Sequence, residues 1–377
     1  MDPEGPLTCV VKIGSAVLAP EGGLRLDTVD RLAGEIADLH AGGVRVILVS
    51  SGAVACGLPM LGIDRLPDRI SDRQAAAALG QPIVISAWES ALRKRGLHAA
   101  QALLTADDID FRERFVNAQR KLMTLLDVGA IPIINENDSV SYEGVSLGDN
   151  DRLGTLVSCL LGADLMILLS VADGLREDRG RGGVIPVVEN LKDAARHVGS
   201  SKSVVGRGGM GAKLESAFTA SDLGTTVVIA RGTEPGVLSR IVDGEDVGTR
   251  FPAVLGGLSD QSRRKQWIAH AIRPRGRLIV DDGARSALAD RGASLLPGGV
   301  LGVEAEQSEG FPVGAGVEIC GKDGLPFARG LVNYRYDEIG RITGVRSDVI
   351  EAVLGYTRGD AVIHRDDLVL TSGRPGE

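Results

Sequence analysis

Short, predominantly apolar segments alternate with longer segments of helical pattern over the first 230 residues. The clearest apolar segments are 9–13, 44–49, 131–134 and 165–169. Helical patterns cover residues 27–40, 74–95, 112–127, 151–161 and 210–223. Two further segments of strand pattern lie at 99–104 and 226–230. Strands that are apolar throughout are buried on both faces. We therefore predict an α/β fold with a mostly parallel sheet sandwiched between helices.

The pattern changes after about residue 256. A polar, basic, proline-bearing stretch at 259–277 is followed by short strand patterns and frequent glycines. We expect a second, small β-rich domain that follows a connector. The expected boundaries are a catalytic domain over 1–256, a linker over 257–275, the β-rich domain over 276–360 and a C-terminal tail over 361–377.

Charge and cysteine usage exclude several classes of protein. The net charge is −8, so no general positive field exists to attract nucleic acid or an anionic membrane. The four cysteines stand singly, without metal-ligand spacing, which favours reduced thiols and no metal site made by the protein. No apolar run reaches membrane-spanning length, and the first residues carry no signal-type core. We expect a soluble cytoplasmic protein with no membrane partner.

Three segments can bind anions at the ends of predicted strands. Lys12 lies two residues before Gly14, Ser51-Gly52 forms a small-residue turn, and the glycine-rich segment 206–213 leads into a helix that carries Lys213. Loop amides at helix starts and lysine ammonium groups are both suited to phosphate. Each segment also has a plainer interpretation, as a solvent-facing lysine or a tight turn, and the glycine-rich segment is not a Walker A motif.

Two further segments are dense in carboxylates and carboxamides. Residues 135–138 read Asn-Glu-Asn-Asp and residues 148–151 read Gly-Asp-Asn-Asp. Such groups can recognise an amino acid's ammonium and carboxylate, or hold a divalent metal through water. Ligands of parallel α/β sheets collect beyond the carboxyl ends of the strands. Two lysines, two anion-binding turns and a polar acceptor loop at that edge indicate phosphoryl transfer.

Taken together, these segments resemble the amino acid kinase family in order and spacing. The matching motifs are VVKIGS, SSGAVACG, INENDSV, GDNDRL and GRGGMGAK. The segment RERFVN and a C-terminal part with DDGARSAL, GASLLPGGV and VIHRDDLV are similar to the glutamate-phosphorylating branch of that family, which often carries a PUA domain.

The resemblance implies an ATP-dependent enzyme that phosphorylates the side-chain carboxylate of L-glutamate, the first step of proline synthesis. It implies catalytic roles for Lys12, Lys213 and Asp151, with Asp151 orienting the two lysines. The implied glutamate-binding residues are Ser51, Gly52, Asn135, Asp138, Asp149 and Asn150. Of these, Asp138 suits the substrate ammonium and Asn150 can donate to a carboxylate. Mg²⁺ would be held mainly by the nucleotide phosphates, proline is the expected feedback inhibitor, and a homo-oligomer is expected.

The same resemblance implies an ATP site at the end of the strand 165–169 and at the glycine-rich segment. Its implied residues are Lys12, Ser170, Val171, Arg207, Gly208, Gly209, Met210, Gly211, Ala212 and Lys213. Two positions depart from the family pattern: Val171 stands where an aspartate is usual, and Arg207 stands where a small hydroxyl residue is common. Neither departure removes a catalytic lysine. The two departures leave undecided which contacts these positions make with the nucleotide.

Two alternatives remain at this point. Another member of the family acts on a carbamate, a nucleoside monophosphate or an acylated glutamate. RNA binding is the alternative from a different class, because PUA folds occur in RNA-modifying proteins. Residues 276–358 carry nine Lys and Arg against twelve Asp and Glu, a net of −3, which speaks against an RNA-binding face.

Overall fold

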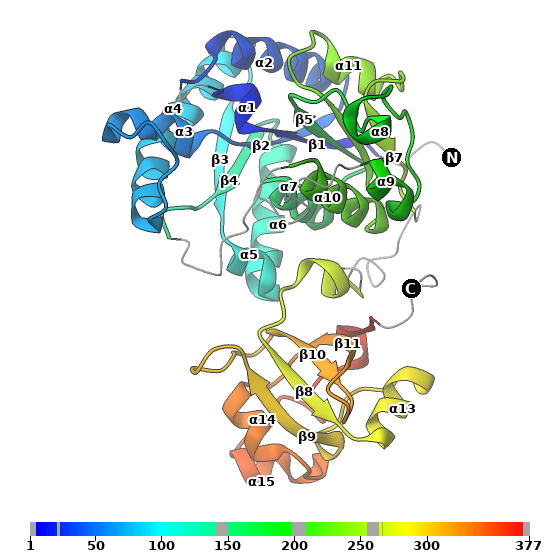
Figure 1. Ribbon diagram of the computed structural model, residues 1–377. Helices are drawn as coiled ribbons and strands as arrows, with labels where there is room; N and C mark the ends of the chain where they lie inside the picture. Colours follow the sequence, from blue (N-terminus) through cyan, green and yellow to red (C-terminus); the bar gives the residue numbers. More distant parts are fainter. Residues whose placement is uncertain are drawn as a thin grey trace. The chain divides into compact units, whose positions relative to one another are not determined.

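The computed structural model describes residues 5–20, 23–140, 150–197, 209–254, 264–265 and 267–371. The chain folds into two compact units, coloured by sequence in Figure 1. Unit 1 comprises residues 1–108 and 116–257, and unit 2 comprises 109–115 and 258–377. Each unit has its own sheet.

Unit 1 is built on a seven-stranded sheet. In spatial order its strands are β3 (Ala99–Leu104), β4 (Ile131–Glu136), β2 (Arg45–Ser50), β1 (Thr8–Ile13), β5 (Leu165–Ser170), β6 (Thr226–Arg231) and β7 (Thr249–Phe251). The first six run parallel, and only β7 pairs antiparallel, with β6. The predicted α/β fold with a mostly parallel sheet is confirmed.

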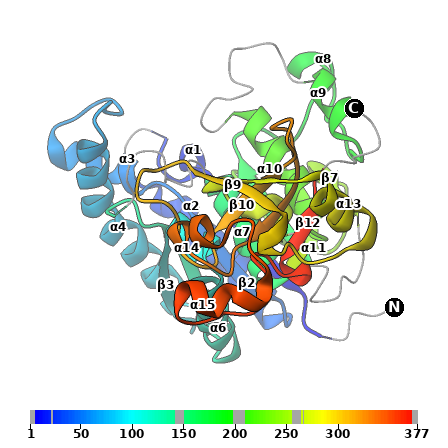
Figure 2. The ribbon, with the colours of Figure 1, turned by 90° about the horizontal axis from the view of Figure 1, so that it is seen from below.

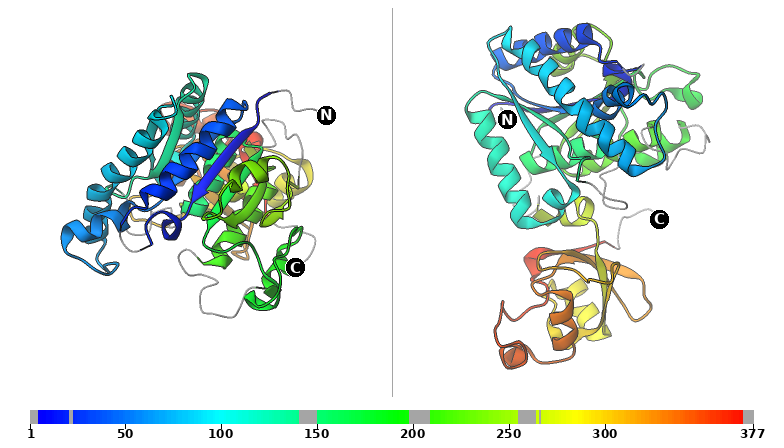
Figure 3. Two further views of the ribbon diagram at one scale, coloured as in Figure 1. Left: turned by 90° about the horizontal axis from the view of Figure 1, so that it is seen from above. Right: turned by 90° about the vertical axis from the view of Figure 1, so that its left-hand side faces the viewer.

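Helices cover both faces of this sheet (Figure 1, and Figure 3 from two further directions). One core joins β1 residues Cys9, Val11 and Ile13 to the apolar sides of α2, α4 and α11. The opposite face of β1 packs against α7, and α10 packs beside it on β6. Because successive side chains of a strand point to opposite faces, Lys12 lies on the face covered by α7.

The helices of the first 257 residues follow the predicted alternation, with short additions. They are α1 (Ser15–Leu18), α2 (Leu26–Ala41), α3 (Ala53–Gly57), η1 (Leu58–Leu61), α4 (Ile70–Arg93), α5 (Ala106–Asp110), α6 (Arg112–Asp127), α7 (Asn150–Leu161), α8 (Glu177–Gly180), α9 (Leu191–His197), α10 (Met210–Asp222) and α11 (Val237–Val242). The edge strand β7 and the helices α1, η1, α5, α8, α9 and α11 were not predicted, since each is short.

Unit 2 contains a five-stranded sheet in the order β12-β11-β10-β8-β9, seen with its helices in Figure 2. Its elements are η2 (Trp267–Ala271), β8 (Gly276–Val280), α13 (Asp282–Arg291), η3 (Pro297–Gly299), β9 (Val300–Ala305), β10 (Gly316–Cys320), β11 (Pro326–Leu331), α14 (Tyr336–Ile342), η4 (Ser347–Val349), α15 (Ile350–Leu354), η5 (Arg365–Asp367) and β12 (Leu368–Leu370). The predicted β-rich character of this region is confirmed.

The ends of unit 2 differ from the expected linker and tail. Trp267, Ile268 and Ile272 of the expected linker are at most 4% exposed, and Ile272 packs on Gly316 of β10. In the expected tail, Val362 and Ile363 are buried in the unit's core, and β12 pairs with β11. A polar or proline-bearing sequence therefore did not mark an unpacked segment here, because a few apolar residues between the polar ones provide the burial.

Candidate active site

A buried carboxylate is shared by two lysines at the centre of unit 1. Asp151 is fully buried, Lys12 is 3% exposed and Lys213 is 8% exposed. Lys12 Nζ forms an ion pair with Asp151 Oδ1, and Lys213 Nζ lies 2.8 Å from Asp151 Oδ2. The structure therefore brings together the three residues for which we expected catalytic roles.

Three elements deliver these side chains to one point. Lys12 stands near the carboxyl end of β1, and Asp151 and Lys213 lie in the first turns of α7 and α10. Gly154 brings α7 close to the sheet, because a Cβ there would lie only 2.7 Å from Met166 Cε of β5 and in ordinary contact, at 3.5 Å, with Lys12 Cβ. Thr155 Oγ1 donates a hydrogen bond of 3.0 Å to Ser216 O and so ties α7 to α10.

The two ammonium groups determine the charge of Asp151. Burial by itself raises the pKa of this carboxyl, but the nearby charges of Lys12 and Lys213 and their hydrogen bonds outweigh it and hold the pKa below its ordinary value. The N-terminus of α7 also favours a negative charge in its first turn. The cluster thus carries two positive charges and one negative, and the excess positive charge suits a phosphoryl group.

A network of amide groups lies at the carboxyl ends of β2 and β4. The register pairs Val49 with Ile134, so Ser50 and Asn135 follow side by side. Asn150 Nδ2 lies 3.0 Å from Ser50 O, 2.8 Å from Ser51 Oγ and 3.0 Å from Asn135 Oδ1. Both N–H groups of Asn150 are therefore used by the protein. This changes the expectation that Asn150 donates to a substrate carboxylate, because its amide nitrogen is already occupied.

Close packing of α3 on α4 holds the turn that contains Ser51. Gly52 has a φ of +103°, which favours glycine. A Cβ on Gly57 would lie 1.8 Å from Ala76 O, and a Cβ on Gly80 would lie 1.8 Å from Ala53 O. Only glycine allows this approach of the two helices.

Asp138 follows this network and is half-buried. The pKa of its carboxyl is raised to about 6, mainly by burial and in smaller part by the charge of Glu136. A cationic group bound beside Asp138 would remove both penalties, since it offsets the negative charge. The position suits an ammonium group. Asp149 lies outside the described residues.

The structure describes some, but not all, of the residues expected at the nucleotide site. Ser170 ends β5 and is buried, and Val171 beside it is 55% exposed. Gly209 is the N-cap of α10 and makes no side-chain cap hydrogen bond, so the amides of Met210, Gly211 and Ala212 can face a phosphate. Arg207 and Gly208 lie outside the described residues.

Sequence reasoning missed two groups near this site. Gln81 of α4 accepts a hydrogen bond of 2.8 Å from Asn135 Nδ2; its only sequence signal is its place between Gly80 and a proline inside a helix. Asp173 forms ion pairs with Arg176 at 2.6 Å and with Arg231 at 3.2 Å, and Arg231 pairs with Ser170 across β5 and β6. No pattern in the sequence links Arg231 to Asp173, which lies 58 residues before it.

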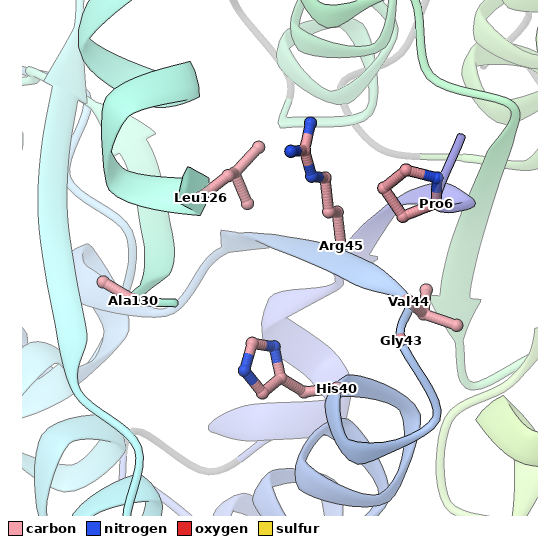
Figure 4. A pocket seen from close by; sticks show the side chains of 7 residues that line it. All are labelled: Pro6, His40, Gly43, Val44, Arg45, Leu126 and Ala130. Carbon is pink, nitrogen blue, oxygen red and sulfur yellow. The ribbon is translucent and has the colours of Figure 1, made fainter. Parts of the chain in front are cut away.

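A small cavity lies at the other end of the strands. Its volume is about 140 Å³, and Figure 4 shows the His40 and Arg45 side chains that line it. It is lined by Pro6, His40, Gly43, Val44, Arg45, Leu126 and Ala130. Pro6 precedes β1 and Arg45 begins β2, so the cavity lies away from the lysine cluster at the strands' carboxyl ends. In the part of the chain that the structure describes, no helix combines the length and apolar character needed to cross a membrane.

Comparison with known proteins identifies the family. The profile of the amino acid kinase family matches residues 7–231, and that of the PUA domain matches residues 276–354. The chain belongs to the amino acid kinase family. The lysine cluster and the amide network both lie inside the part of the chain that matches this family.

Relatives in this family are similar over almost the whole chain. The glutamate 5-kinase of Geobacter sulfurreducens is 47% identical over 367 residues, which cover 96% of each chain. The glutamate 5-kinase of Thermus thermophilus is 43% identical over 365 residues, again 96% of each chain. Among solved structures, N-acetylglutamate synthase from Neisseria gonorrhoeae, complexed with coenzyme A and N-acetyl-glutamate, matches with a TM-score of 0.50 and 18% identity. That match covers 65% of this chain and 59% of the synthase, and it supports the fold alone.

Proposed function

We propose that this amino acid kinase transfers the γ-phosphoryl group of ATP to the side-chain carboxylate of L-glutamate and forms L-glutamyl 5-phosphate. The observation that carries the proposal is the pair of buried lysines held by one carboxylate, next to an amide-lined acceptor site. The relatives named glutamate 5-kinase, which align over 96% of their length, support glutamate as the acceptor and proline synthesis as the pathway.

The acceptor needs no general base. A glutamate side chain has an ordinary pKa of about 4.3, so its carboxylate is already ionised at neutral pH and can attack the γ-phosphorus directly. The protein's task is to bring the two anions together and to stabilise the charge of the transition state. Asp151 suits the task of a positioning group rather than a base, because Lys12 and Lys213 engage both of its oxygens.

In this proposal the two lysines act on the transferring phosphoryl group from two sides. Lys12 reaches it from β1, and Lys213 reaches it from α10 together with the first amides of that helix. Charge-assisted hydrogen bonds from ammonium groups are stronger than neutral ones. The departing ADP phosphates would stay near the N-terminus of α10, and Ser170 and Val171 would line the nucleotide beyond them.

Substrate recognition in this proposal uses residues on β2, β4 and α7. Ser51, Gly52 and Asn135 would lie near the reacting carboxylate, Asp138 would bind the α-ammonium group, and Asn150 would complete the pocket. Asp149 is proposed from the sequence alone. The raised pKa of Asp138 supports its role, because the bound ammonium relieves the cost of its charge.

Mg²⁺ is proposed to accompany ATP. Among the described residues, no group of three or more His, Cys, Asp or Glu has the arrangement to hold a metal ion, and the lysines engage both Asp151 oxygens. The residues present therefore fit an ion held mainly by the nucleotide phosphates and water. When bound, the ion would neutralise phosphate charge.

Three finer proposals complete the function. Proline shares the α-carboxylate and the ammonium of glutamate, so it can compete at the Asp138 side of the pocket as a feedback inhibitor. A homo-oligomer is supported by exposed apolar side chains on η1 and α4: Met60 is 59%, Leu79 37% and Ile83 39% exposed. A cytoplasmic location is supported by its soluble substrates, ATP and glutamate.

Trapping of the product tests this function. The purified chain is incubated with ATP, Mg²⁺, L-glutamate and hydroxylamine, and the acyl phosphate is measured as its hydroxamate. We expect hydroxamate only when glutamate is present, and a Lys12→Ala variant serves as the catalytic control. ATP turnover that requires a carbamate, a nucleoside monophosphate or N-acetylglutamate instead would refute the choice of substrate.

A further inference from the structure

We infer that Gln81, a residue of α4, positions the acceptor site by anchoring Asn135 and, through it, Asn150. The inference rests on the proposed function, because it concerns glutamate binding at that site. Asn150 then presents its side-chain carbonyl oxygen to the substrate, and its amide N–H groups stay bound to the protein. Gln81 is here a positioning residue that acts through Asn135.

The hydrogen bonds of Asn135 leave little freedom to its side chain. A primary amide offers two N–H donors and a carbonyl oxygen with two acceptor sites. Asn135 Oδ1 accepts from Glu136 N at 2.9 Å and from Asn150 Nδ2 at 3.0 Å. Asn135 Nδ2 donates to Gln81 Oε1 at 2.8 Å. Three of the four positions of Asn135 are therefore used within the protein, and one N–H remains for a substrate oxygen.

The hydrogen bonds of Asn150 likewise decide which atom of its side chain is left for the substrate. Its Nδ2 serves three protein acceptors, on Ser50, Ser51 and Asn135. Within the described residues, no hydrogen bond uses Asn150 Oδ1. The acceptor site thus offers one N–H from Asn135, suited to a carboxylate oxygen, and one carbonyl oxygen from Asn150, suited to an ammonium group.

Gln81 is the outer anchor of this arrangement. Asn135 is 3% exposed, so an N–H of its side chain that loses its acceptor is not fully compensated by water. If Asn135 turned over, its NH₂ would face the Glu136 N–H and the Asn150 NH₂, and its oxygen would face Gln81 Oε1. Donors would meet donors and acceptors would meet acceptors. Gln81 opposes this turn from the side that Glu136 and Asn150 do not reach.

The position of Gln81 is in turn fixed by the packing of α4. Gly80, which precedes it, lies so close to α3 that a Cβ would meet Ala53 O at 1.8 Å. Pro82, which follows it, lies inside the helix and removes one backbone N–H from the hydrogen-bond ladder. The contact of Gly80 with Ala53 therefore holds this part of α4 against the helix that follows Gly52.

Steady-state kinetics of the full chain in the hydroxamate assay test the inference. Gln81→Met removes the acceptor and keeps the length of the side chain. We expect the KM for glutamate to rise about tenfold, the scale of one net hydrogen bond, while the KM for ATP and the Tm change little. Gln101→Met is the control, because it makes the same change at an exposed position of β3 and should leave both KM values as in the wild type.

A double-mutant cycle with Asn135→Ala shows whether Gln81 acts through Asn135. We expect Gln81→Met to add no more than about twofold to the glutamate KM of Asn135→Ala. An unchanged glutamate KM in Gln81→Met overturns the inference, as does a full tenfold effect in the Asn135→Ala background. Parallel rises in both KM values, together with a Tm lower than that of Gln101→Met, also overturn it, since they mark a structural role. A wild-type chain that makes no hydroxamate refutes the proposed function instead.

Discussion

Replacing Asp151 by asparagine should separate stability from catalysis at the lysine cluster. Asp151→Asn keeps the size of the side chain and removes the one negative charge between two buried ammonium groups. As a general scale, two like unit charges roughly 5 Å apart repel by about 3 kcal/mol at an effective dielectric constant of about 20. Removing one partner of a buried ion pair costs about 3–5 kcal/mol, which is the loss of unfolding free energy we expect.

This loss is a large share of the roughly 5–15 kcal/mol that stabilises a protein. The double variant Asp151→Asn/Lys12→Met removes one of the two like charges, so it should regain part of the lost stability but none of the activity. Lys12→Met alone leaves Lys213 paired with Asp151 and should change stability least. Urea denaturation measures the unfolding free energy, and the hydroxamate assay measures kcat.

The ionic strength provides an independent measurement. Salt screens buried charges much less than exposed ones, so the difference in unfolding free energy between Asp151→Asn and wild type should stay nearly constant as salt increases. A phosphate-bearing ligand supplies negative charge at the same place, so ADP should raise the Tm of Asp151→Asn more than that of wild type. An Asp151→Asn variant as stable as wild type, or a double variant less stable than the single one, would contradict this electrostatic account.

Further predictions follow from the same site. Lys12→Ala and Lys213→Ala should each lower kcat by roughly 10²-fold or more, the scale of losing one donor to the transition state; near-normal kcat in both would remove them from catalysis. Because the pKa of Asp138 is raised to about 6, its carboxyl gains a proton as the pH falls through that value, so kcat/KM for glutamate should fall below about pH 6. Asp138→Asn should abolish that inflection, and its persistence would assign it to another group. Gly80→Ala should destabilise the protein by about 1–3 kcal/mol through overpacking against Ala53 and raise the KM for glutamate, as thermal unfolding and kinetics can check; an unchanged Tm would show that α4 can shift.

The sequence alone determined the local features of this protein. Strands β1, β2, β4 and β5 were predictable because a short run that is apolar at nearly every position is buried on both faces. The ends of these strands were predictable as the place of chemistry, because parallel strands bring their carboxyl ends to one edge. The candidate residues Lys12, Asn135 and Asp151 could thus be chosen from motifs that local spacing makes recognisable.

Only the tertiary structure decided which of these groups meet. Asp151 pairs with Lys12 from β1 and with Lys213 from α10, and Gln81 reaches Asn135 from a helix whose pattern carries no polar signature. The burial of Val362 and the pairing of β12 also escaped the sequence. The physical reason is common to these cases: a hydrogen bond or ion pair depends on sub-ångström placement of atoms that are distant in sequence, and that placement follows from packing, not from local pattern.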